Sequence, residues 1–224
     1  MNKVKIGVVG AGIYGTYHIR TYKCDPNVEK VVFCDLNEER KRIAEEKFGV
    51  KGYTSIKEMI ETEKLDAVSI ATSDPYHFEP CKDAIESGIK YLLIEKPMAL
   101  TVKECEEIIE LAEKNGVKIS VDFHKRWDPA YNCIKTDIKS EDKKIIRGYM
   151  SLDDAIAVPE NWFTWTDKSS PAWFLGVHCY DLIRYITESE VEKVYAVGNK
   201  EVLKKNFEEL QNYNIKTKFL EFDI

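Results

Sequence analysis

The sequence has little of what marks a metalloprotein or a disulfide-rich protein. Among its 224 residues are four histidines, and no H-x-x-x-H or H-E-x-x-H spacing occurs. The six cysteines are scattered without a C-x-x-C pair, which predicts reduced and mostly buried thiols. We therefore expect no metal site. A G-x-S-x-G nucleophile elbow is also absent, which disfavours a serine hydrolase.

Long apolar runs and an excess of positive charge are missing as well. No segment approaches the ~20 apolar residues of a membrane span, and a strand-like run begins at Val4 without the apolar segment of a signal peptide. The formal net charge of −6 argues against a nucleic-acid or anionic-membrane surface, because either needs clustered lysine and arginine. We expect a cytoplasmic protein that binds neither nucleic acid nor membrane.

The sequence does contain a glycine-rich motif directly after an apolar run. Residues 4–9 are mostly apolar and β-branched, as in a buried parallel strand, and Gly10, Gly12 and Gly15 then form G-x-G-x-x-G. In such a motif the first glycine allows a tight turn, the second lets backbone approach a pyrophosphate, and the third lets a helix pack on the strand. A helix is expected to begin near Ile13, with its N-terminal N–H groups available to phosphates.

An acidic residue after the next strand makes this motif more specific. The apolar residues 31–34 end in Asp35, twenty residues after Gly15. A carboxylate at this place binds both hydroxyls of an adenosine ribose and repels a 2′-phosphate. The combination predicts a site for NAD, with NADP less favoured. The alternative interpretation is a glycine-rich turn followed by a helix-capping aspartate.

Strands and helices then alternate as far as about Asp122. Further strands are predicted at residues 66–71, 91–94 and 117–121, and helices at residues 37–48, 76–87 and 101–115, with a short one after Ser55. This alternation indicates an α/β fold with a doubly wound parallel sheet, the Rossmann arrangement, over residues 1–122. Its ligands bind at the carboxyl ends of the strands. Residues expected at those ends are Gly10, Asp35, Thr72, Glu95, Lys96 and Asp122.

Residues typical of helix ends support the predicted bounds of these helices. Asn37, Ser55 and Thr101 are typical N-cap residues, and Gly49 and Gly116 are typical stop signals.

Residues 123–224 follow a different pattern, which predicts a second α+β domain. Helices are expected at residues 127–138, 171–187 and 201–210, strands at residues 144–152, 191–197 and 215–222, and a loop rich in aromatic residues at 153–171. No internal repeat and no low-complexity linker occurs.

Lys96 is the first candidate for chemistry, because it lies between Glu95 and Pro97 at the end of a predicted strand. If it faces a nicotinamide, partial burial and the positive charge of that ring would both lower its pKa towards that of a general base. A surface lysine in a loop is the other interpretation.

His178 is the second candidate. On a helix it shares a face with Phe174 and Asp181, and the Asp181 carboxylate would then fix its tautomer and raise its basicity. A core histidine with a satisfied hydrogen bond is the alternative. His77 and His124 are weaker candidates for contact with cofactor or substrate, and His18 is expected to be structural.

Aromatic residues near residue 165 allow two interpretations. Trp162, Phe163, Trp165 and Trp173 would suit the apolar face of a sugar ring, or they are core or lid residues.

Taken together, these residues resemble the glucose–fructose oxidoreductase, inositol dehydrogenase and rhizopine-catabolism (Gfo/Idh/MocA) family over residues 3–198. The marks of this resemblance are residues 10–15 (GAGIYG), Asp35, Ala71-Thr72 followed by His77, Glu95-Lys96-Pro97, Arg126 with Asp128-Pro129, and Gly176-x-His178-x-x-Asp181. The combination is far more specific than any single mark.

The resemblance implies a Rossmann domain joined to an α/β domain with a large open sheet, which binds substrate and forms dimers or tetramers. It implies catalytic roles for Lys96 and His178. It places NAD(P) against Gly10, Gly12, Ile13, Tyr14, Gly15, Asp35, Leu36, Ala71, Thr72, His77, Glu95, Lys96 and Arg126. We expect the substrate near Trp162, Phe174 and Asp181.

Two features depart from the family pattern. Members commonly have an aspartate four residues before the histidine, where this chain has Phe174. Most members also continue well past this length, so we expect the second domain to be shortened at its C-terminus, with an exposed sheet edge that endangers oligomerisation.

The leading hypothesis is an NAD-dependent oxidoreductase acting on a secondary alcohol of a sugar, cyclitol or related polyol. One alternative is a non-catalytic NAD-binding sensor or regulatory protein, suggested by Phe174 and the short second domain. The other is an NAD-dependent glycosidase that uses transient oxidation.

Overall fold

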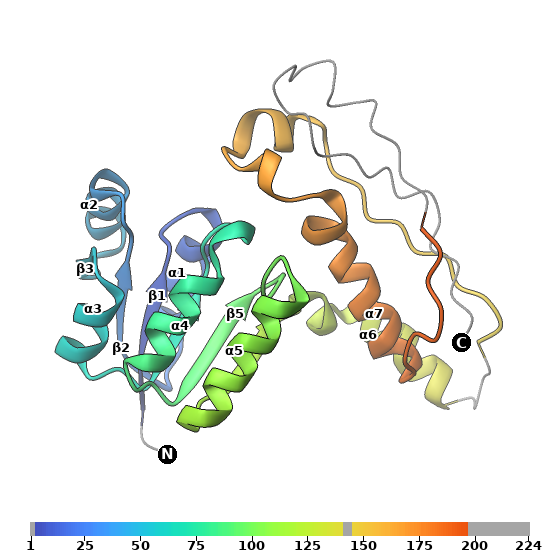
Figure 1. Cartoon of the computed structure of the whole chain (residues 1–224), viewed down its shortest axis with the longest axis horizontal. Coiled ribbons are helices and arrows are strands. Elements are labelled where there is room, and N and C mark those ends of the chain that lie inside the picture. Colours follow the sequence, from blue (N-terminus) through green and yellow to red (C-terminus); the bar gives the residue numbers. More distant parts are fainter. Residues whose placement is uncertain (1–2, 141–144, 197–224) are drawn as a thin grey trace. The chain divides into compact units, whose positions relative to one another are not determined.

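The computed structural model describes residues 3–140 and 145–196 and divides into two compact units, with the boundary between Asp122 and Phe123 (Figure 1). None of the helices in these two ranges is long and apolar enough to cross a membrane.

The first unit is built on one parallel sheet of six strands in the order β3-β2-β1-β4-β5-β6. The strands are β1 (Val4–Val9), β2 (Val28–Cys34), β3 (Gly52–Tyr53), β4 (Ala67–Ile70), β5 (Tyr91–Glu95) and β6 (Lys118–Asp122). The order reverses between β1 and β4, which makes their carboxyl ends the topological switch point of a doubly wound sheet. The predicted Rossmann fold is confirmed; the two-residue strand β3 was not predicted.

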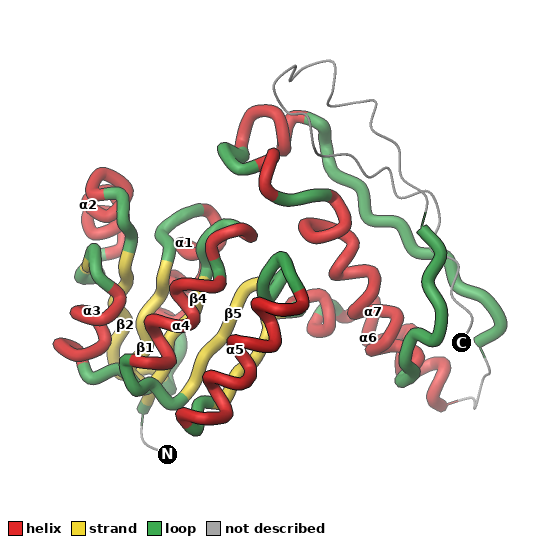
Figure 2. The backbone as a smooth tube through the Cα atoms, viewed as in Figure 1, coloured by secondary structure: helices red, strands yellow, loops and turns green. Residues whose placement is uncertain are grey.

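Five helices connect these strands (Figure 2). They are α1 (Ile13–Cys24), α2 (Glu38–Phe48), α3 (Ile56–Glu63), α4 (Phe78–Glu86) and α5 (Val102–Asn115), and a 3₁₀ turn at Asp74–Tyr76 precedes α4. The predicted caps are confirmed, since the side chains of Asn37, Ser55 and Thr101 each accept a backbone N–H of the first turn. Gly49 and Gly116 end their helices in the left-handed conformation.

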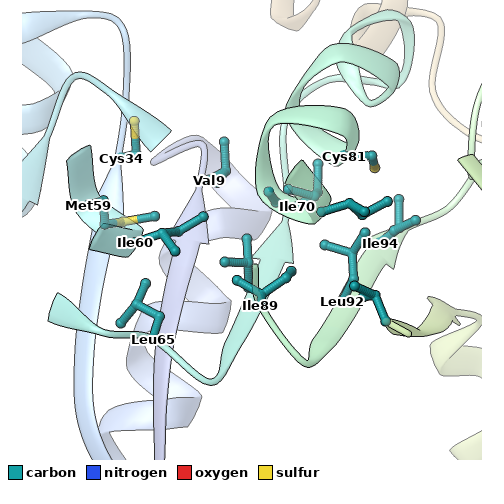
Figure 3. Packing of buried hydrophobic residues seen from close by; sticks show 14 of the residues in the cluster. Val9, Cys34, Met59, Ile60, Leu65, Ile70, Cys81, Ile89, Leu92 and Ile94 are labelled. Carbon is teal, nitrogen blue, oxygen red and sulfur yellow. The ribbon is translucent and has the colours of Figure 1, made fainter. Parts of the chain in front are cut away.

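Apolar side chains are buried on both faces of the sheet. The larger cluster joins strand residues such as Ile70 and Ile94 to residues of α3, α4 and α5, and Figure 3 shows part of it. On the opposite face Val8 and Phe33 pack with Ile19 of α1 and Ala44 of α2. Burial on both faces explains the nearly continuous apolar runs of the central strands, and it holds their carboxyl ends in fixed positions.

The cysteines are less buried than predicted. Cys34 and Cys81 are buried, but Cys24 and Cys133 are exposed, since Cys24 is the last residue of α1 and Cys133 lies on a helix without buried residues. Burial raises the pKa of the Cys34 thiol to about 12.

The described part of the second unit is mainly helical. It contains a 3₁₀ turn at His124–Trp127, α6 (Pro129–Ser140), π-helical turns at Val158–Trp162 and Ala172–Gly176, a 3₁₀ turn at Thr166–Lys168, and α7 (Val177–Thr187). The predicted helix over residues 171–187 therefore begins with a π-helical turn. A hydrogen bond of 2.7 Å from the Tyr185 hydroxyl to Asn132 Oδ1 joins α7 to α6.

Two predicted strands of this unit are corrected. Residues 145–152 form no strand, and the apolar side chains that suggested one are exposed, Ile146 at 95% and Tyr149 at 79%. Residues 191–196 contain only an isolated bridge at Tyr195. Alternating apolar residues form a strand only where a neighbouring strand accepts their backbone groups. The predicted helix at 201–210 and the strand at 215–222 lie outside the described residues.

Candidate functional site

The glycine turn between β1 and α1 is shaped by two of its three glycines. Gly10 has φ +94°, and a Cβ on Gly15 would lie 1.8 Å from the Gly10 carbonyl oxygen. Neither position tolerates a side chain. A Cβ on Gly12, in contrast, would meet nothing within 4 Å. Gly12 is thus not required by the packing of the chain itself, and the open space above it fits the close approach of a pyrophosphate to the N-terminus of α1.

Asp35 is held in place at the end of β2. It is buried, its Oδ2 accepts the Ala11 N–H at 2.9 Å and its Oδ1 accepts the Asn37 N–H at 2.8 Å. The guanidinium of Arg40 also donates to this carboxylate, from Nη2 at 3.2 Å and from Nε at 3.3 Å. The sequence interpretation missed Arg40; the available signal was an arginine in the first turn of the helix that follows the aspartate.

Three exposed apolar side chains follow the carboxyl ends of β1 and β2. Ile13 and Tyr14 begin α1 and Leu36 follows Asp35; all three were predicted to contact the cofactor. Ala71 follows β4 and is buried. Their contact with a cofactor stays a prediction.

Lys96 is buried directly after β5, with 6% of its surface exposed, so the interpretation as a surface lysine is wrong. Burial lowers the pKa of its amine, while the nearby carboxylates of Asp74 and Glu95 act in the opposite direction. The lowered pKa is in the predicted direction, and its cause is desolvation. Asp74, itself buried, was not predicted as a site residue; its signal was an acidic residue after a strand.

His77 connects two loops at this edge. Its Nδ1 lies 2.6 Å from the Pro97 carbonyl oxygen and its Nε2 lies 3.0 Å from that of Thr72. Carbonyl oxygens only accept hydrogen bonds, so the His77 ring donates from whichever nitrogen carries a proton. His77 therefore joins the loop after β4 to the loop after β5, at the residue that follows Lys96. Its predicted contact with the cofactor stays a prediction.

His18, on α1, contacts residues of β4 and β5 close to Lys96. Its Nδ1 lies 2.7 Å from Ser69 Oγ, and its Nε2 lies 2.8 Å from Glu95 Oε1 and 3.9 Å from Asp122 Oδ2. Glu95 and Asp122 are neighbours in the register of β5 and β6, and His18 links these like charges.

These His18, Glu95 and Asp122 atoms lie within 4.8 Å of one another, as a metal site would need. The 2.8 Å separation between His18 and Glu95 is a hydrogen-bond length, shorter than the roughly 3.3 Å between ligands of a tetrahedral zinc ion. The absence of a metal stays a prediction.

In the second unit, the candidate histidine lies beside another histidine. The rings of His178 and His124 meet edge to face with centroids 4.8 Å apart. Both carboxylate oxygens of Asp181 accept hydrogen bonds from Arg126, at 2.8 Å from its Nε and with a second, shorter bond from Nη2. Asp181 thus binds Arg126, while its predicted hydrogen bond to His178 stays a prediction. The predicted contact of Arg126 with the cofactor also stays a prediction.

The aromatic residues of this unit divide between core and surface. Phe163 stacks on Trp165 with centroids 4.3 Å apart, and Phe174 meets Phe163 edge to face at 4.9 Å. Trp165 is buried, which favours the core interpretation for this cluster, whereas Trp162 is exposed. Phe174 thus packs on aromatic rings at the position where the resemblance led us to expect an aspartate.

Comparison with known proteins gives the family. The model of the oxidoreductase family with an NAD-binding Rossmann fold, Gfo/Idh/MocA, matches residues 4–123. The chain belongs to this family. The family resemblance and NAD as the cofactor of the Rossmann domain are thereby confirmed.

Among the curated relatives of the family, myo-inositol 2-dehydrogenase of Thermotoga maritima is 30% identical over 88% of this chain and 58% of its own length. An uncharacterised oxidoreductase of Bacillus subtilis, YrbE, is 25% identical over 88% of this chain and 57% of its own. The solved structure of myo-inositol 2-dehydrogenase from Lactobacillus plantarum aligns with a TM-score of 0.81 at 25% identity, over 93% of this chain and 63% of that one. The chain spans less than two thirds of the length of these relatives.

Proposed function

We propose that the chain acts as an NAD-dependent oxidoreductase on a secondary alcohol of a sugar, cyclitol or related polyol. The observation that carries the proposal is the buried Lys96 with its lowered pKa, in the same domain as the glycine turn. The substrate class rests on relatives named as inositol dehydrogenases.

In this proposal Lys96 is the general base. A neutral buried amine accepts the proton of the substrate hydroxyl, and the carboxylates of Asp74 and Glu95 stabilise the ammonium that forms. Bound at the glycine turn and Asp35, NAD would supply the hydride acceptor of the reaction. His77 and His18 keep the base in place by hydrogen bonds to the Pro97 carbonyl and to Glu95.

We assign His178 a role in orienting the substrate hydroxyl or relaying its proton. Its burial and the neighbouring His124 ring support a defined ring orientation. His178→Gln should then lower kcat more than it raises KM, whereas a purely structural histidine would affect stability first.

The test compares the wild type, Lys96→Met and Lys90→Met in a screen of sugars and cyclitols with NAD, followed by NADH absorbance. Lys90 precedes the same strand, but its amine pairs with Asp66 at 2.9 Å. We expect Lys96→Met to lower turnover by about 10²–10⁴-fold while NAD affinity and the activity of Lys90→Met stay near wild type.

Retained turnover in Lys96→Met would disprove the assignment of the base. NAD binding without turnover on any substrate would favour the sensor, and release of an aglycone without net NADH would favour the glycosidase.

A further inference from the structure

The Asp35 carboxylate has two kinds of partner, and they differ in how easily they can leave. The N–H groups of Ala11 and Asn37 are backbone donors fixed by the glycine turn and by the start of α2. Arg40 is a long side chain that reaches the carboxylate from the solvent side, with 59% of its side chain exposed. The guanidinium can therefore move away while Asp35 keeps two hydrogen bonds.

Arg40 is placed next to Asp35 by the local structure of α2. Asn37 caps the helix by accepting the Arg40 N–H at 2.9 Å, which puts Arg40 in the first turn and directs its side chain to the end of β2. Arg42 on the same helix is equally exposed, at 59%, but it pairs with Glu46 at 2.6 Å, on its own helix. The contact of Arg40 with Asp35 is thus specific to its position.

The two side chains favour different cofactors, Asp35 favouring NAD and Arg40 favouring NADP. A carboxylate after the second strand accepts hydrogen bonds from the 2′- and 3′-hydroxyls of NAD and repels the 2′-phosphate of NADP, whereas an arginine nearby accommodates that phosphate. Its planar guanidinium binds phosphate through two parallel hydrogen bonds. Here both groups occupy one place, and Arg40 neutralises the charge that would reject NADP.

We propose that Arg40 is a cofactor-selectivity residue that allows the site to accept NADP beside NAD, while Asp35 keeps NAD preferred by binding the guanidinium. The inference rests on the dinucleotide site of the proposed function and adds which nucleotides it takes. It revises the prediction from Asp35 alone, which did not include the neighbouring guanidinium.

The test measures Kd for NAD and NADP separately, by titration calorimetry, in the wild type, Arg40→Ala, Asp35→Asn and the double variant. We expect Arg40→Ala to weaken NADP binding by about tenfold or more and to change NAD binding by less than about threefold. Asp35→Asn should strengthen NADP by about tenfold and weaken NAD, and Arg40→Ala should abolish this gain in the double variant. The gain should shrink as salt is raised.

Arg42→Ala is the matched control and should change neither Kd. Asp35→Ser serves as a second variant if Asp35→Asn is poorly folded by circular dichroism. Equal changes of both Kd values in Arg40→Ala, or an NADP gain that persists without Arg40, would overturn the inference and leave the dinucleotide site intact. A wild type that binds neither nucleotide would overturn the dinucleotide site and this inference together.

Discussion

At the scale of single residues, opposing influences act on the Lys96 amine. Burial disfavours its charged form, and the Asp74 and Glu95 carboxylates favour it. Because the lowering by burial is larger, the amine loses its proton below the ordinary pKa of 10.5. A buried lysine at this place is therefore better suited to accept a proton than an exposed one.

A pH profile tests this balance. We expect kcat/KM for alcohol oxidation to rise with pH, with an inflection below 10.5, as Lys96 becomes neutral. Asp74→Asn should move the inflection to lower pH, since it removes a carboxylate that raises the pKa of Lys96. An inflection that stays in place in Asp74→Asn would contradict the role of this carboxylate.

Glu63 is expected to contribute to stability at neutral pH. The neighbouring Lys30, together with the Tyr53 hydroxyl and Lys51, lowers the pKa of Glu63 from 4.5 to about 2. This contribution is fully present above pH 4.5 and is lost as the pH falls towards 2.

Glu63→Gln should lower the free energy of unfolding at pH 7 by about 1–2 kcal/mol, a value reduced because both lysines are half exposed. Urea unfolding at pH 7 and pH 2.5 measures it, and the difference from wild type should shrink at the lower pH. Glu61→Gln is the control, since Glu61 is exposed and its carboxylate–amine pair with Lys57 is long, at 3.9 Å. A difference independent of pH would show that Glu63 acts through packing.

Among the elements, the turn from β1 into α1 contains one glycine that the fold requires and another that is available for ligand binding. Gly15 is needed because α1 packs against the Gly10 carbonyl, whereas Gly12 faces open space. The same turn carries the Ala11 N–H that binds Asp35, so the turn and the end of β2 are coupled.

Two alanine substitutions distinguish these roles. Gly12→Ala should fold with nearly wild-type stability and weaken NAD binding by about tenfold or more, because a methyl group would occupy the space of the pyrophosphate. Gly15→Ala should lower the unfolding midpoint strongly, because its Cβ would lie 1.8 Å from the Gly10 oxygen. Thermal unfolding and NAD titration measure both, and normal NAD binding by Gly12→Ala would argue against the site.

At the scale of the whole molecule, NAD binding should stabilise the chain by mass action. With NAD at 100-fold its Kd we expect about 2.7 kcal/mol and a rise in the unfolding temperature. Hydrogen exchange should slow most at residues 10–16 and around Asp35. Uniform protection of both units, or none, would disagree with a site centred on the glycine turn.

Much of the first unit could be predicted because its signals are local. The glycine motif, the caps at Asn37, Ser55 and Thr101, and the apolar strands each express a short-range requirement of backbone conformation or burial. The second unit was predicted less well, because residues 145–152 have a strand-like pattern but no pairing neighbour in the described part of the chain.

The Rossmann fold, the glycine turn, the positions of Asp35 and Lys96, and the family can all be inferred from the amino-acid sequence. The burial of Lys96 near Asp74, the link that His77 makes between two loops, and the contact of Arg40 with Asp35 are visible only in the folded chain. The physical reason is range: backbone turns and caps depend on residues a few positions apart, whereas desolvation and charge pairing depend on groups that only the folded sheet brings together.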